Sequence, residues 1–388
     1  MIRFILSLLT ALSLEAIEHT SNISLKYNSY NHYSNEIIIQ GDTKLQLQND
    51  IFTTAITLEY LYSDEYKERR YIILNELYFS KAYEDYDLIF GKTIKYWGEL
   101  EGFNIADIYN QKNYLLDPFN KGAKLGSLGF NITRYIDEDS IEFGLKFYEE
   151  NLKYPSQNSP YYPFLIGYDN ELQLSNSLYL PSVYLAYSFI TEDSFDSETK
   201  IILYHGYDNK RYFKLNNKGN LSQYAYRINK LLVLSNIIYN DTIFKYELSY
   251  TDVISDKKMS DYAQISLGLE KTLYDLAGTN ISFYLEYYKY LYMQKNMIQN
   301  VDISEIYDND IFLAFRVDFQ DTEDSELKSG ILYDLGKSER VFKIEIKSRI
   351  IDNFVLNSEY LQIISKDNTL LSNIGDSSRF NVGITYTF

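Results

Sequence analysis

The chain ends in residues Arg379 to Phe388, which read RFNVGITYTF. From Phe380 onward every even-numbered residue is apolar, every odd-numbered residue is polar or glycine, and the last residue is aromatic. Successive side chains of a β-strand point to opposite faces of a sheet. The segment therefore predicts a strand with one apolar face that ends on an aromatic ring.

The same alternation recurs along most of the chain from about residue 23. Phe342, Ile344 and Ile346, for example, are interleaved with charged residues. Comparable segments are 141–147, 244–250, 263–270 and 311–320. Turn-forming pairs such as Asn240-Asp241 and Ala277-Gly278 separate these segments without an intervening helix. The pattern predicts a succession of hairpins, with about 18 strands in all (16–18), an even number being usual for single-chain barrels.

Alternating strands occur both in soluble β-sandwiches and in membrane β-barrels, and the composition favours the barrel. The chain of 388 residues has 41 Tyr and 22 Phe but only 5 Pro and no Cys, and its mean hydropathy is −0.31. A membrane barrel can be this polar, because only the lipid-facing residue of each alternating pair must be apolar. No stretch beyond the N-terminus approaches the apolar length of a spanning helix. We therefore predict an all-β fold, a transmembrane antiparallel up-and-down β-barrel. We expect Tyr60, Tyr62, Trp97 and the Tyr287–Tyr292 cluster to sit largely in its aromatic girdles.

Residues 1–16, MIRFILSLLTALSLEA, combine an early Arg3 with a short apolar stretch and a small Ala16. This pattern is typical of a cleaved secretory signal peptide. We predict that residues 17–388 form one barrel domain with no further domain boundary. The alternation is the same in monomeric and trimeric barrels, so it leaves open whether the chain forms a homo-oligomer.

The closing segment resembles the last strand of Gram-negative outer-membrane proteins, whose terminal Phe is recognised by the barrel assembly machinery. The resemblance covers ten residues. It implies that Phe388 is an assembly signal, that the cell outer membrane is the location, and that outer-membrane lipid and the assembly machinery are partners.

Two irregular segments interrupt the alternation, at about 97–124 and 150–180. The first follows an expected strand at Tyr86–Tyr96. With Gly91, Lys92, Trp97-Gly98-Glu99 and Asp107 it resembles barrel proteins of the DUF1302 and alginate-export-like type. That resemblance implies a loop in or over the lumen and passage of a hydrophobic or polymeric solute. The second segment contains three of the five Pro residues and several Tyr, which predicts a surface loop that packs on itself or grips a solute.

The first segment also supplies candidate gatekeepers. If it folds inward, its charges narrow the pore and focus the local field, and if it folds outward they are simply solvated. A Ca²⁺ site made by Glu99, Glu101 and Asp107 is a further alternative. The predicted pore-lining or constriction residues combine these loop charges with lumen-facing wall residues: Glu99, Glu101, Asp107, Lys112, Asp117, Arg316, Asp318, Lys343, Glu345, Lys347 and Arg349.

Function follows from what the chain contains and lacks. A net charge of −17 argues against a nucleic-acid partner and is compatible with a cation-preferring pore. The only histidines are His19, His32 and His205, none with an evident Ser and carboxylate beside it, so we predict no enzymatic activity. No metal or cofactor motif is evident. The leading prediction is an outer-membrane channel for ions or small solutes. The alternatives are a surface adhesin or receptor, an export or uptake barrel, and a barrel hydrolase that acts through His205.

Overall fold

The computed structural model describes residues 16–48, 52–192, 195–255, 259–293, 306–365 and 370–388. The predicted signal peptide lies outside these residues except for Ala16, which begins the first strand. Among the described residues, no helix is long and apolar enough to cross a bilayer.

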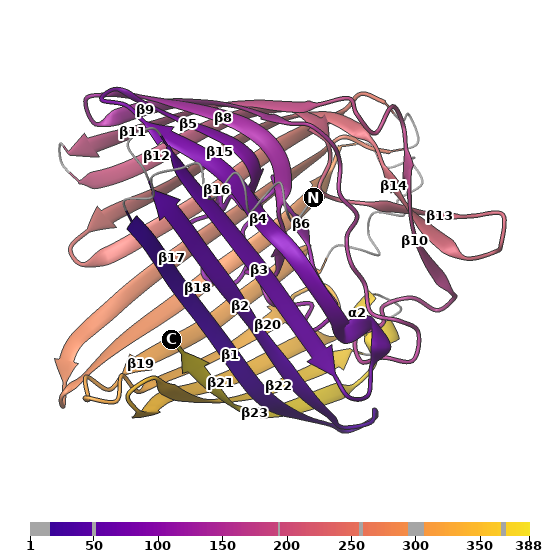
Figure 1. Cartoon of the computed structure of the whole chain (residues 1–388), viewed down its shortest axis with the longest axis vertical. Helices are drawn as coiled ribbons and strands as arrows, with labels where there is room; N and C mark the ends of the chain where they lie inside the picture. The colour runs from indigo at the N-terminus through magenta and orange to yellow at the C-terminus, as the bar shows by residue number, and fades with distance from the viewer. Residues whose placement is uncertain (1–15, 49–51, 193–194, 256–258, 294–305, 366–369) are drawn as a thin grey trace.

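Eighteen strands within the described ranges form one closed antiparallel sheet, which confirms the predicted barrel (Figure 1). Each strand pairs with the next along the chain, and β1 pairs with β23 to close the ring. The strands of this wall are β1 (Ala16–Tyr30), β2 (Glu36–Gln48), β3 (Thr53–Ser63), β4 (Arg70–Ala82), β5 (Tyr86–Thr93), β8 (Ser127–Ile136), β9 (Asp139–Lys146), β11 (Ser182–Glu192), β12 (Asp196–Tyr207), β15 (Arg227–Tyr239), β16 (Thr242–Val253), β17 (Tyr262–Leu276), β18 (Thr279–Tyr292), β19 (Asn309–Asp318), β20 (Glu326–Asp334), β21 (Glu339–Ile351), β22 (Phe354–Ser365) and β23 (Ser377–Thr387).

The alternation of residue types sorts side chains between the two faces of this wall. On β16, Phe244, Leu248 and Tyr250 are exposed on the outside, whereas Glu247 and Ser249 are buried in the lumen. The exposed large apolar side chains recur in the same way on the other wall strands. An apolar outer surface of this extent would associate in water, so it fits contact with the hydrocarbon of a membrane.

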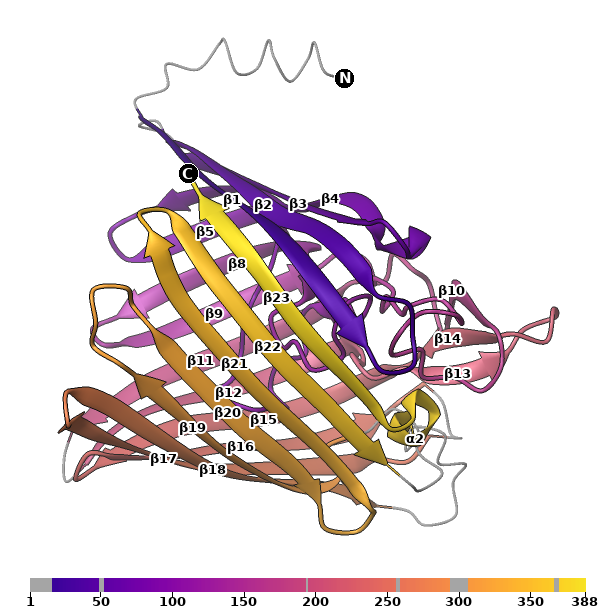
Figure 2. The ribbon, with the colours of Figure 1, turned by 90° about the horizontal axis from the view of Figure 1, so that it is seen from below.

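The connections differ between the two ends of the barrel. At the end where β1 begins and β23 ends, which we call the turn end, the connections are short. Asn240 with Asp241, and Ala277 with Gly278, have positive φ at both central positions, as a type I′ hairpin requires. At the opposite end, the loop end, residues 94–126, 147–181 and 208–226 make long excursions. Figure 2 shows β10, β13 and β14 projecting at the end opposite the C-terminus.

Short elements occupy the long connections. These are β6 (Gln111–Lys112), β7 (Lys124–Leu125), β10 (Tyr168–Leu174), β13 (Tyr212–Leu215), β14 (Leu221–Ala225), the 3-10 turn η1 (Lys67–Arg69) and α2 (Leu370–Ile374). Strand β10 pairs in parallel with β14, which pairs with β13, so two loops share a three-stranded cap sheet at the loop end. The prediction of an irregular segment at 150–180 is therefore incomplete, and the loop at 208–226 was not predicted.

Aromatic side chains of the second irregular segment pack on the loop itself. The ring of Phe164 lies 5.1 Å from that of Tyr154, 5.0 Å from that of Tyr168 and 4.8 Å from that of Phe213, between ring centroids. Two of these contacts lie within the segment and the third joins it to the loop at 208–226, so the structure shows the predicted packing and extends it to a neighbouring loop.

The predicted aromatic girdle needs correction. Tyr62 is exposed on the outside, but Trp97, Tyr288 and Tyr290 are buried inside the barrel. On β18 the even-numbered positions face the lumen, because Glu286 and Tyr288 share the buried face. These rings fill the space between the wall and a loop that enters it.

Candidate functional site: a loop held inside the lumen

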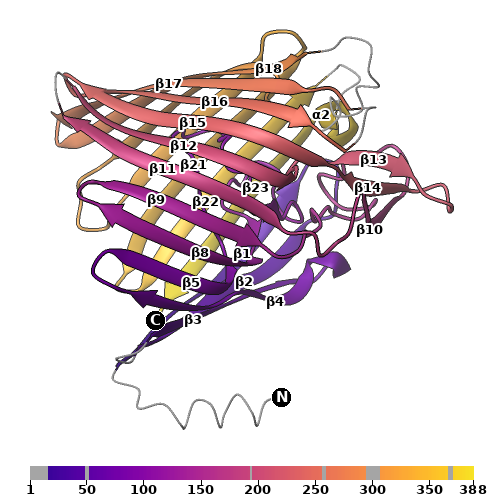
Figure 3. The same ribbon diagram turned by 90° about the horizontal axis from the view of Figure 1, so that it is seen from above.

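Residues 94–126 leave the wall after β5 and fold into the barrel, and we call this segment the lumen loop. Trp97, Leu100, Ile108 and Tyr109 are at most 4 % exposed. The ring of Trp97 lies 4.9 Å from that of Tyr184 on β11, between centroids and edge to face. The inward arrangement of the two predicted alternatives is thus the one that the structure shows. Figure 3 shows β12, β15 and β16 in the wall opposite β22 and β23, across the interior.

Glu247 on β16 is one of the two carboxylates that fix the lumen loop. It is fully buried, and its Oε1 accepts a hydrogen bond from the backbone N–H of Glu99 at 2.8 Å. Its Oε2 accepts one from the N–H of Ala106 at 2.9 Å. Because one carboxylate binds two points of the loop seven residues apart, it closes this part of the loop into a compact turn against the wall.

Glu286 on β18 repeats the arrangement 39 positions further along the chain. Its two oxygens accept hydrogen bonds from the N–H of Glu101 at 2.6 Å and of Gly102 at 2.8 Å. The hydroxyl of Tyr288 donates to the same carboxylate and accepts from the N–H of Phe103 at 2.9 Å. Backbone groups that would otherwise be buried without partners are therefore satisfied by wall side chains.

The far end of the lumen loop is bound to the opposite part of the wall. Arg379 on β23 donates to Asp117 Oδ2 at 2.8 Å and to the carbonyl of Leu116 at 3.2 Å, and it also pairs with Glu359 on β22. Asn75 on β4 accepts from the N–H of Gly126 at 2.7 Å. The loop is therefore attached on several sides of the lumen.

Two predicted gatekeepers take part in this anchoring instead of facing the pore as free charges. Asp107 is 4 % exposed, and its oxygens lie 2.8 Å from Lys112 Nζ and 2.6 Å from Lys124 Nζ. Asp117 is buried against Arg379. Ion pairs already balance both carboxylates, and Asp107 and Lys112 also line a second pocket beside the loop, so a role of these residues and of Asp117 in the pore stays a prediction.

The predicted Ca²⁺ alternative also fails on geometry. Glu99 accepts a hydrogen bond from Asn236 at 2.9 Å, and Glu101 faces Lys121 at 3.6 Å. Asp107 is held by its two lysines. The three carboxylates have three separate sets of partners, and they do not converge on a common point.

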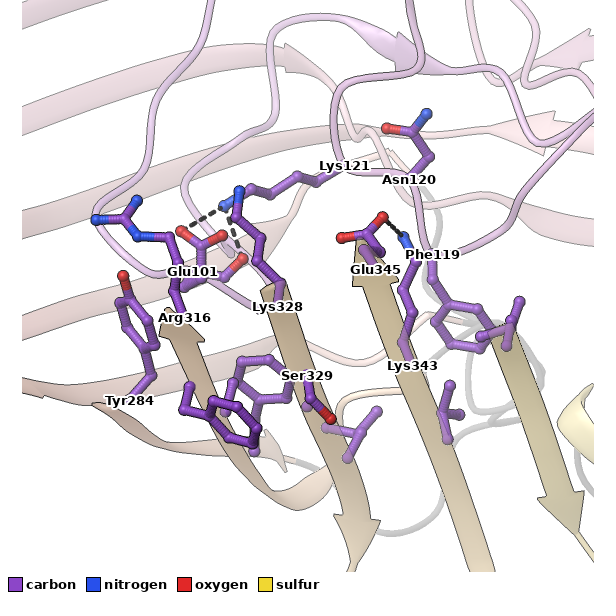
Figure 4. A pocket seen from close by; sticks show the side chains of 18 of the residues that line it. Glu101, Phe119, Asn120, Lys121, Tyr284, Arg316, Lys328, Ser329, Lys343 and Glu345 are labelled. Carbon is purple, nitrogen blue, oxygen red and sulfur yellow. Dashed lines mark hydrogen bonds and ion pairs between the residues drawn. The ribbon is translucent and has the colours of Figure 1, made fainter. Parts of the chain in front are cut away.

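A pocket of about 290 Å³ remains between the lumen loop and strands β18 to β22 (Figure 4). Glu101, Phe119 and Lys121 line it from the loop. Charged and aromatic residues line it from the wall: Tyr284, Phe312, Arg316, Lys328, Lys343 and Glu345. We call this space the constriction pocket, since the loop and the wall approach each other across it.

The constriction pocket carries more positive than negative side chains. Arg316, Lys328, Lys343 and Lys121 face two carboxylates, Glu101 and Glu345. Lys343 is paired with Glu345 at 2.8 Å and with Glu359 at 3.1 Å. Lys328 is paired with Glu326 at 3.2 Å but also lies directly opposite Arg316 in the β19–β20 ladder. Like charges on directly opposed residues repel, so this pair favours an anion between or beside them.

The structure brings together four of the predicted pore residues: Glu101, Arg316, Lys343 and Glu345. The others lie elsewhere: Glu99 against Asn236, and Asp318, Lys347 and Arg349 toward the turn end. Lys328, Tyr284 and Phe312 are not among the residues that the sequence predicts. Lys328 could have been found, because it lies on the lumen face of an alternating strand and the two hairpin registers place it opposite Arg316 and Glu345.

The histidines show one contact that the sequence did not suggest. His19 Nε2 lies 2.7 Å from Ser21 Oγ on the same strand, but among the described residues no carboxylate is hydrogen-bonded to this ring. His205 lies on the outer face of β12, where its Nδ1 is 2.8 Å from Asn229 Oδ1. Its position on the outside, away from the constriction pocket, gives no support to a hydrolase in the lumen.

Comparison with known proteins shows which solved structures share this fold. No model of a protein family matches the chain, and no curated protein matches it by sequence. Solved structures of Pseudomonas aeruginosa outer-membrane proteins do match. OccK2 (OpdF) is 10 % identical with a TM-score of 0.58, over 97 % of this chain and 98 % of that chain. OccK11 (OpdR) is 10 % identical with a TM-score of 0.58, over 97 % and 96 %.

A structure of Pseudomonas aeruginosa OpdK with vanillate is 8 % identical with a TM-score of 0.55, over 97 % of this chain and 99 % of that chain. At such identities the likeness establishes a shared barrel fold and no more. The comparisons give no support to the resemblance with the DUF1302 and alginate-export-like barrels.

Proposed function

We propose that the protein is an outer-membrane channel that passes small solutes, and that its constriction pocket favours anions with an apolar body. The observation that carries this proposal is the lumen loop, which narrows the barrel to a pocket lined by excess positive charge and by aromatic rings. A barrel closed by its own wall has no lipid-exposed edge, and its polar lumen offers a route across a membrane.

The charges of the pocket support the preference for anions. Arg316 makes no ion pair with another described residue, and it faces the pocket beside Lys328 (Figure 4). In a narrow lumen with low-dielectric walls, such charges concentrate ions of opposite sign. The net charge of the whole chain, −17, does not decide selectivity, because many of the acids lie on turns and surface loops.

The aromatic rings support an apolar body on the solute. Phe119, Phe312, Tyr284 and Tyr307 line the same pocket as the cations. An aromatic carboxylate presents a flat apolar ring and one negative end, which matches such a lining. The structure of OpdK contains vanillate, an aromatic carboxylate, and vanillate is therefore the first solute to test here.

The test is a planar lipid bilayer into which the folded barrel is inserted under a salt gradient. We expect discrete current steps, a reversal potential of the sign that anion preference gives, and a concentration-dependent block of the current by vanillate. The neutral analogue vanillyl alcohol is the solute control, since it keeps the ring and lacks the carboxylate.

The variant Arg316→Ala with Lys328→Ala should move the reversal potential toward cation preference and weaken the vanillate block. The control variant is Lys44→Ala, which removes a cation from the lumen face of β2 away from the pocket. A bilayer without current steps would contradict the channel. Current steps that are equally selective in both variants would contradict only the role of the pocket. No observation in the structure favours an adhesin or an exporter of a polymeric solute over the channel.

A further inference from the structure

Three aspartates gather at the loop end of the barrel, outside the constriction pocket. Asp310 on β19 and Asp334 on β20 are direct partners in the antiparallel ladder and share the lumen face. Asp308 lies two residues before Asp310. One carboxylate oxygen from each residue lies within 4.8 Å of the other two. The three acids lie at the open end of one hairpin: Asp308 just before β19, Asp310 at the start of β19, and Asp334 at the end of β20.

Nearby positive charge does not balance this cluster. Lys337 Nζ is 2.6 Å from Asp308 but 3.9 Å from Asp334 Oδ2. Burial acts to lower the pKa of Lys337, but its hydrogen bond to Asp308 and the charges of Asp308, Asp334 and Glu339 raise it overall. One ammonium group thus faces several carboxylates. Directly opposed like charges such as Asp310 and Asp334 are unfavourable without a cation between them.

Within the described part of the chain, two of the carboxylate oxygens are buried without a hydrogen-bond partner. Asp334 is 2 % exposed, and its Oδ1 accepts from the backbone N–H groups of Gly336 and Lys337, both at 2.6 Å. Among the residues that the structure describes, its Oδ2 has no hydrogen-bond partner, and neither does Asp308 Oδ1. A buried carboxylate oxygen without a donor lowers the stability of the fold, so a cation bound at these two atoms would be stabilising.

We propose that Asp308, Asp310 and Asp334 form a Ca²⁺ site at the loop end of the barrel. Calcium binds carboxylate oxygens at 2.3–2.6 Å, so two of its ligands can be almost 5 Å apart, and the three oxygens already satisfy this limit. Magnesium demands near-ideal octahedral geometry at 2.0–2.1 Å and is dehydrated reluctantly, so it is seldom held by a cage of protein carboxylates alone, whereas calcium accepts such a set. The site therefore prefers the larger cation.

The position of the site connects it to the lumen loop. Asp308 directly follows Tyr307, whose ring stacks on that of Phe103 with centroids 4.1 Å apart and planes 6° apart. Phe103 belongs to the part of the loop that Glu286 and Tyr288 hold. A cation bound to Asp308 would fix the backbone beside Tyr307, and so it would support the constriction from the loop end.

The test uses the full folded barrel in detergent, with Tb³⁺ as a luminescent substitute for Ca²⁺ that is excited through nearby tyrosines. We expect tyrosine-sensitised Tb³⁺ emission, displacement by Ca²⁺ at lower concentration than by Mg²⁺, and a rise in the Tm on addition of Ca²⁺. The variant Asp310→Asn with Asp334→Asn should weaken Tb³⁺ binding by more than about tenfold, because ligand charge sets the affinity.

The matched control is Asp318→Asn with Glu326→Gln, an acidic pair directly opposed in the same two strands at the turn end. It should leave Tb³⁺ binding and the Ca²⁺-dependent rise in Tm unchanged. If the first variant does not fold, Asp308→Asn alone, at a partly exposed loop position, should still reduce the Tb³⁺ emission. Emission that Ca²⁺ does not displace, or that survives equally in the first variant and in the control, would overturn the proposal.

Discussion

The variant Glu247→Ala tests whether wall carboxylates hold the lumen loop in place. In the structure this buried side chain accepts two backbone hydrogen bonds, from Glu99 at 2.8 Å and from Ala106 at 2.9 Å. An ordinary hydrogen bond contributes about 0.5–1.5 kcal/mol net, so the loss of both should weaken docking of the loop by about 1–3 kcal/mol. At 1.4 kcal/mol for each factor of ten, the docked state loses about one to two orders of magnitude relative to the undocked state.

Single-channel recording measures the consequence directly. We expect the variant to show larger mean conductance and frequent transitions between current levels, because the undocked loop no longer holds the constriction. Glu247→Gln keeps one acceptor oxygen and should give an intermediate result. The control is Glu270→Ala on β17, which removes a lumen carboxylate that pairs with Lys245 at 2.7 Å. If Glu247→Ala and Glu270→Ala give the same conductance and noise as the native channel, the loop does not depend on this anchor.

Three other predictions concern packing, buried charge and pH. Gly144→Val should lower the stability by about 1–3 kcal/mol, since a Cβ there would lie 2.2 Å from the ring of Tyr184; an unchanged urea midpoint would contradict this. Arg69→Ala should cost about 3–5 kcal/mol by leaving Glu36 buried without its partner, and thermal unfolding that matches the native protein would refute it. Burial raises the pKa of Glu99, although its bond from Asn236 opposes this, so acidification should neutralise it early and increase anion preference. Reversal potentials measured across the acid range should show that change, and Glu99→Gln should remove it.

The wall of the barrel could be predicted from the sequence because its information is local. Alternation over about ten residues shows which face of a strand contacts lipid. A pair such as Asn240-Asp241 predicts a tight turn at one place in the chain. The strand count and the closing strand at Arg379–Phe388 follow from these short patterns, and the structure confirms both.

The site depends on contacts between distant parts of the chain, and there the sequence is less informative. Asp107 and Glu101 are both acidic residues of one irregular segment, yet one is paired with Lys124 and the other lines the pocket. Their difference depends on how residues 94–126 pack against β16 and β18, more than 100 positions away. The sequence predicts Trp97 in the outer girdle, because it does not show which distant residues surround the ring. A tryptophan suits either a membrane interface or a filled lumen.

The pairing of β1 with β23 has a consequence for the order of folding. Asn22 faces Thr387 across this seam, and Ser24 Oγ lies 2.7 Å from Thr385 Oγ1, so the contacts join residues more than 350 positions apart. The other wall pairs join strands that follow one another along the chain and can form without β23. Until β23 is available, the sheet has two open edges whose backbone groups can pair with a strand of any other chain. Completion of the ring must therefore wait for the final residues, and the period before closure is when the molecule is most exposed to wrong partners.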